Sequence, residues 1–269
     1  MVGRRSSSIC HGMQGAMVSL ERNVVLSIAG YDPSAGAGVL SDCKTLESCG
    51  CYGLGVLTSV TSQSAEEFTD LVWLDSERIK SQLSPLIDSF DIKVIKIGLT
   101  AGYKMLADIL EITKKQLPGV PVLWDPVVKS SSGFEFFSEN DSRLLPSLLS
   151  QIDYITPNLE EARFLTNAED AEQAANFLAK DCSGVITGIS KEDQNSVFDL
   201  VFENKTRKQV EGKSLDTPKH GSGCVFSSSL ISGIAKGLSL EESAEFAKSY
   251  TSDFLQSSST NIGLHQVKQ

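Results

Sequence analysis

The residues best suited to chemistry lie in Lys219–Leu230, which reads Lys-His-Gly-Ser-Gly-Cys-Val-Phe-Ser-Ser-Ser-Leu. Gly221 and Gly223 bracket Ser222 in a glycine-rich turn. Apolar residues then recur every four positions, at Phe226, Leu230 and Ile234, so the pattern predicts an amphipathic helix opened by that turn. The first turn of a helix has amide groups without internal partners and carries the positive end of the helix dipole. Since glycine lets an anion approach the backbone, this turn is a candidate phosphate site.

Cys224 falls at or near the first residue of the predicted helix. The field of the helix start would lower the pKa of its thiol, and the thiolate could then accept a proton. Two simpler interpretations stay open. A Gly-x-Gly before a helix is often only a turn, and cysteine is often buried as a small apolar residue.

Other polar residues follow apolar runs. The glycine loop Gly30–Gly38 follows Val24–Ala29, and three single positions stand in a similar relation to later runs: Gln63, Asp125 and Asn158. Each single position has an ordinary structural explanation, as a solvated side chain, a cap or a turn. The glycine loop is neither a Walker A loop, since no Gly-Lys-Ser/Thr closes it, nor a dinucleotide fingerprint.

Short apolar runs typical of buried strands alternate with helical patterns along the chain. The predicted strands are Val24–Ala29, Gly53–Val60, Val94–Ile97, Val120–Trp124, Gly184–Ile189 and a hairpin of Val197–Phe202 with Lys205–Val210. The predicted helices include one through Leu46 after the glycine loop, Ser76–Phe90, Lys104–Gln116, one opened by Asn158 and Glu161, Ala171–Lys180, and one opened by a capping box of Ser239 and Glu242. The polar stretch Thr61–Thr69 is predicted to be a loop or flap.

Strands that alternate with helices imply parallel βαβ units, with helices on both faces of the sheet. In such sheets ligands bind outside the carboxyl ends of the strands. This rule brings the Gly30–Gly38 loop, Gln63, Asp125, Asn158 and the Gly221–Cys224 turn to one rim, although they are distant in the sequence. We take their convergence as the argument for a single site.

Composition limits the kind of protein. The 269 residues suit one large α/β domain, and 41% hydrophobic with 22% charged residues is typical of a globular protein. A formal charge of −10 argues against a general nucleic-acid surface. The six cysteines show no zinc-binding spacing and indicate reduced thiols in a cytosolic compartment. No apolar run is long enough to span a bilayer.

Residues 1–22 differ from the remainder. They include Arg4-Arg-Ser-Ser-Ser and lack a signal-peptide core. We expect them to be a disordered leader or an expression remnant outside the fold; a transit peptide is an alternative that so short a segment does not decide. Residues 23–269 are predicted to form a single domain.

Six motifs together resemble a known family: Ile28-Ala-Gly-Tyr-Asp-Pro-Ser-Ala-Gly-Ala-Gly, Ser41-Asp-Cys-Lys-Thr, Lys96-Ile-Gly, Trp124-Asp-Pro-Val-Val, Ile155-Thr-Pro-Asn-Leu-Glu-Glu-Ala and His220-Gly-Ser-Gly-Cys. In this order, from about Val24 to Phe254, they resemble the hydroxymethylpyrimidine and hydroxymethylpyrimidine-phosphate kinases of the ribokinase-like superfamily. The resemblance implies a three-layer α/β/α sandwich with a mostly parallel central sheet. It further implies ATP as phosphoryl donor, Mg²⁺, a small hydroxymethyl heterocycle as acceptor, and a homodimer.

The resemblance also implies roles for individual residues. Cys224 would be the catalytic base, and the backbone of Gly221, Ser222 and Gly223 would form the anion hole. The pyrimidine pocket would be lined by Gly30, Asp32, Gly36, Gln63, Leu99 and Val127. Nucleotide contacts would come from Asn158, Thr187, Gly188 and Lys191, and magnesium would be held near Asp125, Asn158 and Glu161.

The chain departs from the family pattern after one strand. Where relatives usually have Lys-Gly-Gly-His, it has Thr187-Gly-Ile-Ser, so a lysine expected near the nucleotide phosphates is missing and Lys191 is the nearby replacement. Ser222 also stands where threonine is commoner, and Leu99 where methionine often lies near the ring.

The sequence as a whole predicts a cytoplasmic kinase that transfers phosphate from ATP to 4-amino-5-hydroxymethyl-2-methylpyrimidine and to its monophosphate. Two alternatives stay open. One is a pyridoxal kinase of vitamin B6 salvage, since some relatives with the same cysteine-bearing loop accept that ring. The other is a non-catalytic pyrimidine sensor, which the residue at position 187 would favour.

Overall fold

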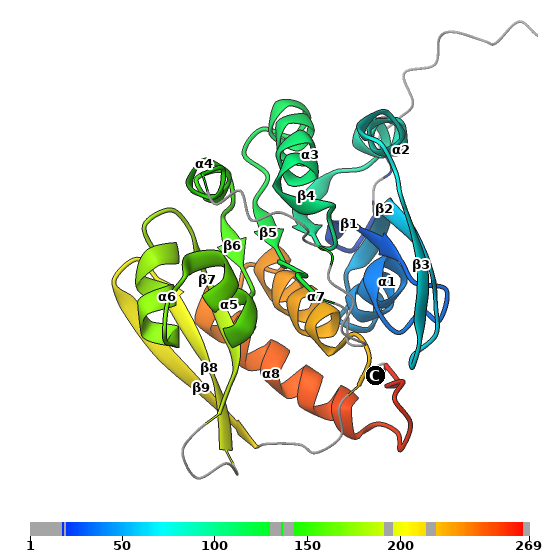
Figure 1. Cartoon of the computed structure of the whole chain (residues 1–269). Coiled ribbons are helices and arrows are strands. Elements are labelled where there is room, and N and C mark those ends of the chain that lie inside the picture. The colour runs from blue at the N-terminus through cyan, green and yellow to red at the C-terminus, as the bar shows by residue number, and fades with distance from the viewer. Residues whose placement is uncertain are drawn as a thin grey trace, which may run out of the picture.

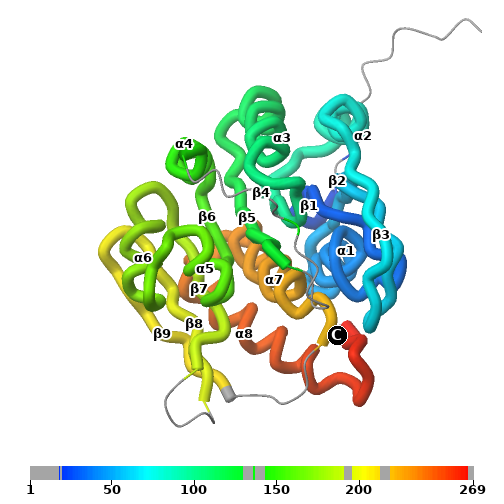
Figure 2. Tube along the Cα trace, in the orientation of Figure 1, coloured from blue at the N-terminus to red at the C-terminus, as the bar shows by residue number. Residues whose placement is uncertain are grey.

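The structure is a computed structural model that describes residues 20–129, 143–190, 196–213 and 219–265, together with Val18 and Phe136 (Figures 1 and 2). The predicted phosphate contact Lys191 and residues 1–17 lie outside the described residues. Val18 pairs with Phe90 in an isolated bridge, and Arg22 forms an ion pair of 2.8 Å with Glu47.

One mixed sheet of nine strands, in the order β3-β2-β1-β4-β5-β6-β7-β8-β9, crosses the described part of the chain. The strands are β1 (Val24–Tyr31), β2 (Tyr52–Gln63), β3 (Phe68–Trp73), β4 (Ile92–Ile97), β5 (Val122–Trp124), β6 (Tyr154–Ile155), β7 (Ser183–Ser190), β8 (Ser196–Glu203) and β9 (Thr206–Lys213). Pairing is parallel from β2 through β7, and β3, β8 and β9 add antiparallel edges. The mostly parallel sheet is therefore confirmed.

Helices cover both faces of this sheet (Figure 1). One layer holds α1 (Gly38–Ser48), α7 (Ser222–Ala235) and α8 (Leu240–Gln256). The opposite layer holds α2 (Ser76–Ser89), α3 (Gly102–Gln116), α4 (Leu145–Leu149), α5 (Leu159–Thr166) and α6 (Ala171–Leu178). The predicted three-layer α/β/α architecture is thus confirmed.

Alternation along the central strand explains why both layers are needed. In β1, Leu26 and Ile28 belong to the apolar cluster under α2 and α3, whereas Val25 belongs to the cluster under α7 and α8. Successive side chains of a strand point to opposite faces, and all three are fully buried. A strand that is apolar on both faces must lie in the middle of a sandwich.

The prediction of a loop or flap over Thr61–Thr69 is wrong except at residues 64–67, which connect two strands. Thr61 to Gln63 continue β2, and Phe68 begins the antiparallel strand β3, with Gln63 opposite Phe68. The side chains are polar because this hairpin lies at the edge of the sheet and is largely exposed. The polarity of these side chains reflects their exposure to solvent and does not indicate that a strand is absent.

The prediction that α7 is amphipathic is also wrong. Every residue from Val225 to Gly233 is buried, including four serines. The helix packs between the sheet, α1 and α8, which leaves it no solvent face. Its serines are tolerated because each hydroxyl finds an acceptor inside the protein, such as Val225 O for Ser229 at 2.8 Å.

The remaining predicted elements are present within a few residues of their expected ends, including the β8–β9 hairpin and the capping box of Ser239 and Glu242 that opens α8. The short helix α4 was not predicted. None of the helices in the described ranges is both long and apolar enough to cross a membrane.

Candidate active site

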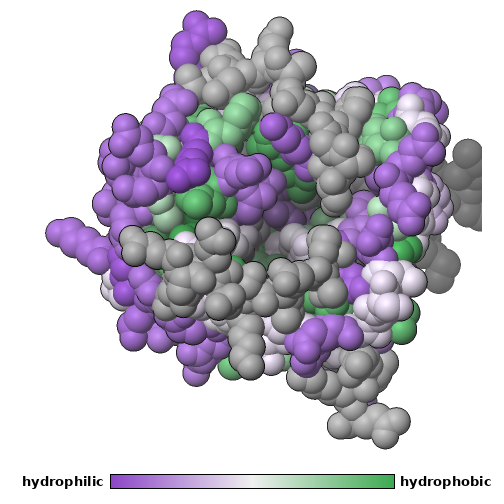
Figure 3. Space-filling view, turned by 60° about the horizontal axis from the view of Figure 1, so that its bottom comes forward, coloured by the Kyte–Doolittle hydropathy of each residue, from purple (hydrophilic) through white to green (hydrophobic). Residues whose placement is uncertain are grey.

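A pocket of about 540 Å³ opens where the parallel strands end, as the topology predicted. Figure 3 shows this side of the molecule hollowed near its centre. The wall contains most of the predicted site residues: Gly30, Asp32, Gln63, Leu99, Asp125, Val127, Asn158, Glu161, Thr187, Gly221, Ser222, Gly223 and Cys224. Residues from seven separate segments therefore meet at one cavity.

Gly36 supports the wall without lining it, because its backbone packs against the turn before α7. Gly221 has a φ of 76°, and a side chain at that position would collide with the carbonyl oxygen of Gly36. Only glycine meets both demands, the left-handed backbone and the close approach. The Gly30–Gly38 loop therefore packs closely against the turn at Gly221.

Asp32 lies where the Gly30–Gly38 loop meets the turn before α7. Its carboxylate accepts hydrogen bonds from the amides of Ser34 and Ala37, each at 2.8 Å, and lies 2.8 Å from Nε2 of His220. Burial alone would raise the pKa of Asp32, but bonds from His220, Ser34 and Ala37 hold it below its usual value. The ionised carboxylate ties the first glycine loop to the second.

The start of α7 has the free amides that an anion needs. Among the described residues, the backbone N–H groups of Gly223 and Cys224 donate to no acceptor. Gly223 has open space where a side chain would stand. This end of the helix can therefore bind a phosphate oxygen.

The expected lowering of the Cys224 pKa is not found. Burial raises the pKa of this thiol to about 12; Lys96 opposes the rise, while the charges of Asp42 and Asp125 add to it. A helix dipole contributes at most about 2 kcal/mol, or roughly one and a half pKa units, which is too little to reverse this. Without ligand, Cys224 faces the pocket as a neutral thiol.

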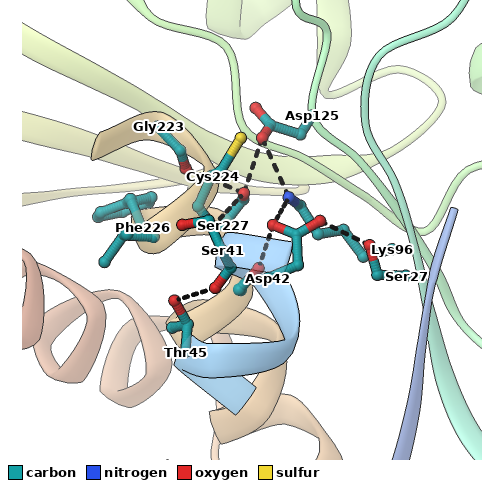
Figure 4. Close-up of polar contacts among 12 residues, drawn as sticks. Ser27, Ser41, Asp42, Thr45, Lys96, Asp125, Gly223, Cys224, Phe226 and Ser227 are labelled. Carbon is teal, nitrogen blue, oxygen red and sulfur yellow. Dashed lines mark hydrogen bonds and ion pairs between the residues drawn. The ribbon is translucent and has the colours of Figure 1, made fainter. Parts of the chain in front are cut away.

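A buried network lies directly behind Cys224 (Figure 4). The ammonium of Lys96, a fully buried side chain, is 2.5 Å from Oδ1 of Asp42 and 3.5 Å from Oδ2 of Asp125. Ser27 and Ser228 donate to Asp42 at 2.5 and 2.8 Å. The network joins β1, α1, β4 and α7 to the carboxyl end of β5.

The charges in this network do not balance. Burial would lower the pKa of Lys96, but Asp42, Cys224 and Asp125 raise it, so the side chain is an ammonium. It stands closer to Asp42 than to Asp125, and burial raises the pKa of Asp125 despite Lys96 and a 2.7 Å bond from Ser227. Asp125 therefore faces the pocket with an incompletely compensated charge.

Asn158 and Glu161 form the capping box that opens α5. Each side chain accepts from the other residue's amide at 2.9 Å. Burial and then the charge of Asp125 raise the pKa of Glu161 to about 8. The structural interpretation of this pair is confirmed, and its predicted binding of metal and nucleotide stays a prediction.

Thr187 lies at an irregularity in β7. Its amide donates to the carbonyl of Pro157 at 2.9 Å, which brings it beside Asn158 in the pocket wall. Gly188, with φ 71°, does not line the pocket; its amide donates to Asp199, which pairs with Lys248 at 2.9 Å. Gly188 shapes the irregularity in β7 at which Thr187 lies.

Four residues near the site received no role from sequence reasoning. Lys96 and His220 stand inside recognised motifs, but their partners are distant in the sequence. Thr156 lines the pocket with a buried hydroxyl that has no partner among the described residues. Lys129 also lines the pocket, and a lysine four residues after Asp125 was the available signal.

Solved structures show the class of protein. The ADP complex of Bacillus subtilis pyridoxal kinase matches with a TM-score of 0.78 at 24% identity, covering 92% of this chain and 98% of that one. A phosphomethylpyrimidine kinase of Clostridium difficile matches with a TM-score of 0.73 at 25% identity, covering 86% and 99%. The fold is that of the ribokinase-like α/β kinases.

Sequence comparison shows the family within this class. The profile described as phosphomethylpyrimidine kinase matches residues 32–268. A hydroxymethylpyrimidine/phosphomethylpyrimidine kinase of Rhizobium meliloti is 30% identical over 236 residues, covering 84% of this chain and 88% of the relative. One of Aquifex aeolicus is 30% identical over 244 residues, covering 87% and 95%. The chain belongs to the phosphomethylpyrimidine kinase family.

Proposed function

We propose that this protein transfers the γ-phosphate of ATP to the hydroxymethyl oxygen of 4-amino-5-hydroxymethyl-2-methylpyrimidine and then phosphorylates the resulting monophosphate. The observation that carries the proposal is the shared pocket. One pocket is lined by Cys224 and the start of α7 with its unpaired backbone amides. The same pocket is lined by the side-chain amide of Gln63 and by the carboxyl groups of Asp125 and Glu161. The relatives from Rhizobium and Aquifex carry names for both activities.

Each part of the pocket has a chemical task in such a transfer. Gln63 offers both a donor and an acceptor, which suits a ring nitrogen beside an amino group. The amides of Gly223 and Cys224 can stabilise the charge on the transferred phosphate. The thiol of Cys224 must lose its proton to act as base, so we propose that this proton passes to solvent as the substrates arrive rather than before they arrive.

The carboxylates fit a magnesium ion. Magnesium in kinases is usually held by one or two carboxylates plus waters and substrate phosphates, and Asp125 and Glu161 both line the pocket with raised pKa values. Burial and then the charge of Asp125 raise the pKa of Glu161, and a cation between the two residues would relieve the second effect. When bound, magnesium would supply charge neutralisation of the phosphates. These two residues, with Asn158 beside them, would hold it.

ATP as donor is supported by the neighbours of this fold. Structures of pyridoxal kinase from Staphylococcus aureus contain ADP or AMP-PCP. Because their identity to this chain is 24%, they indicate the fold and not the acceptor. The pyridoxal alternative rests on the cysteine-bearing loop alone, and the sensor alternative on Thr187.

Turnover of three acceptors with ATP and Mg²⁺ tests the proposal. ADP release should follow addition of the hydroxymethylpyrimidine and of its monophosphate, with kcat/KM at least about tenfold above that for pyridoxal, since a lost paired amide contact costs on the order of 1–3 kcal/mol. Faster turnover of pyridoxal would favour the B6 alternative. Binding of the pyrimidine without ADP release would identify a sensor.

We further propose that the protein is a homodimer in the cytoplasm. The family resemblance supports the dimer, and the edge of the sheet offers a surface for it. On the β2–β3 hairpin, Val60 and Val72 stand opposite each other with 41% and 57% of their surfaces exposed. An exposed apolar pair on an edge strand is typical of an interface.

A further inference from the structure

The charge of the pocket poses a problem for a triphosphate donor. Its described wall contains four carboxyl groups, those of Asp32, Asp125, Glu160 and Glu161, and no arginine. Lys129 is the one lysine in that described wall. Thr187 occupies the position where the family resemblance implies a lysine. An anionic substrate in an acidic pocket needs a compensating cation besides magnesium.

Backbone contacts of Val128, the residue before Lys129, show where Lys129 lies relative to the predicted nucleotide and acceptor regions of the pocket. The amide of the preceding residue, Val128, donates to the carboxylate of Glu161. The carbonyl of Val128 accepts from the amide of Phe136 at 2.9 Å. One neighbour of Lys129 is thus bound to the wall that holds the predicted nucleotide contacts.

Phe136, whose amide is bonded to Val128, contacts the predicted acceptor wall. The ring of Phe136 meets Phe68 edge-on at 5.7 Å between centroids, and Phe68 pairs with Gln63 across the β2–β3 hairpin. Lys129 therefore stands where the donor and acceptor regions adjoin. The backbone of the preceding residue, Val128, is held by these bonds, while Lys129 is exposed and its side chain has the length to follow a phosphate.

We propose that Lys129 is the cationic side chain that contacts the γ-phosphate of ATP during transfer. The inference rests on the proposed function and adds a residue to it. Lys129 would supply the positive charge that the family resemblance implies at position 187. Because the contact is to the transferred group, it should matter more for nucleotides that carry a γ-phosphate than for ADP.

The test compares binding of two nucleotides by calorimetry in the presence of Mg²⁺. Lys129→Met should weaken AMP-PCP by about tenfold or more and ADP by much less, as expected for loss of one charge-assisted contact to phosphate. It should also lower kcat/KM for ATP by at least the same factor. Lys129→Arg should retain most of the affinity, because it keeps the charge.

Two further variants provide a control and a test of rescue. Lys104→Met removes an equally positive but 85% exposed side chain on α3, and should behave as wild type. Adding Thr187→Lys to Lys129→Met should recover part of the AMP-PCP affinity, since it returns a charge to the same wall. A merely structural effect of Lys129 would weaken both nucleotides equally and resist this rescue.

A failure of this inference can be distinguished from a failure of the proposed function. Wild-type turnover together with unchanged AMP-PCP binding in Lys129→Met would overturn the inference alone. Equal weakening of ADP and AMP-PCP would do the same, because the contact would not be to the γ-phosphate. A wild-type protein that binds neither nucleotide would overturn both the inference and the proposed function.

Discussion

Cys224 illustrates how one residue's chemistry depends on its surroundings. Its place at a helix start favours a thiolate, yet burial and the nearby carboxylates Asp42 and Asp125 raise its pKa to about 12. A standing thiolate would add a third negative charge beside the single ammonium of Lys96. Catalysis by this thiol therefore requires substrates or magnesium to change the local charge.

Replacement of this cysteine measures its contribution. Cys224→Ala should keep the fold and nucleotide binding but lower kcat by at least about a hundredfold, the size expected for a positioned general base. Steady-state kinetics at saturating ATP and pyrimidine provide the measurement. Cys43→Ala, a cysteine of α1 that does not line the pocket, is the matched control. Near-normal turnover of the Cys224 variant would assign catalysis to the amides of the turn.

Alkylation of Cys224 tests the same raised pKa directly. Below a pKa of about 12 the thiolate fraction of the free enzyme grows with pH, so reaction with iodoacetamide should accelerate by roughly tenfold per unit between pH 7 and 10. The modified Cys224 peptide is quantified by mass spectrometry. A plateau near pH 7 would contradict the neutral thiol.

At the scale of elements, the buried Lys96 network holds the layers together. Its members come from β1, α1, β4, α7 and the end of β5, and Lys96 is the ammonium between both carboxylates. Removing one partner of a buried ion pair leaves an uncompensated charge, which costs about 3–5 kcal/mol. The network therefore supports the fold as well as the wall behind Cys224.

Urea unfolding of Lys96→Met should accordingly show a loss of about 3–5 kcal/mol in the free energy of unfolding. Adding Asp42→Asn should recover part of the loss, because it removes one of the two stranded carboxylates. Lys93→Met, near the start of the same strand where the side chain is exposed, loses only a surface pair with Asp91 and should change stability by less than about 1 kcal/mol. Equal effects of the two lysine variants would show that the buried network is not stabilising.

At the scale of the whole molecule, the proposed dimer should depend on the β2–β3 hairpin. Light scattering at micromolar concentration should give twice the chain mass for wild type, and Val72→Lys should shift it to a monomer, because charge at an apolar interface is costly. Leu238→Lys, at a 39% exposed residue between α7 and α8, is the control. A monomeric wild type, or a dimer unaffected by Val72→Lys, would exclude this interface.

The sequence by itself determined most of the elements and their order, but not β3 or α4. Periodicity located β1, α2 and α3, the cap residues Ser239 and Asn158 marked two helix starts, and glycine placement marked the turn before α7. These signals are local, because a few neighbouring residues define them. Alternation of strands and helices then implied the parallel sheet, and with it the rim where the site residues converge.

Only the tertiary structure decided which charges meet. Lys96 and Asp42 are separated by 54 residues, and Ser227 and Asp125 by 102, so no local pattern reports their contact. The raised pKa of Cys224, the burial of every side of α7 and the place of Lys129 in the pocket have the same origin. Each depends on desolvation and on partners that folding brings from distant segments, whereas helix and strand patterns depend on neighbours in the chain.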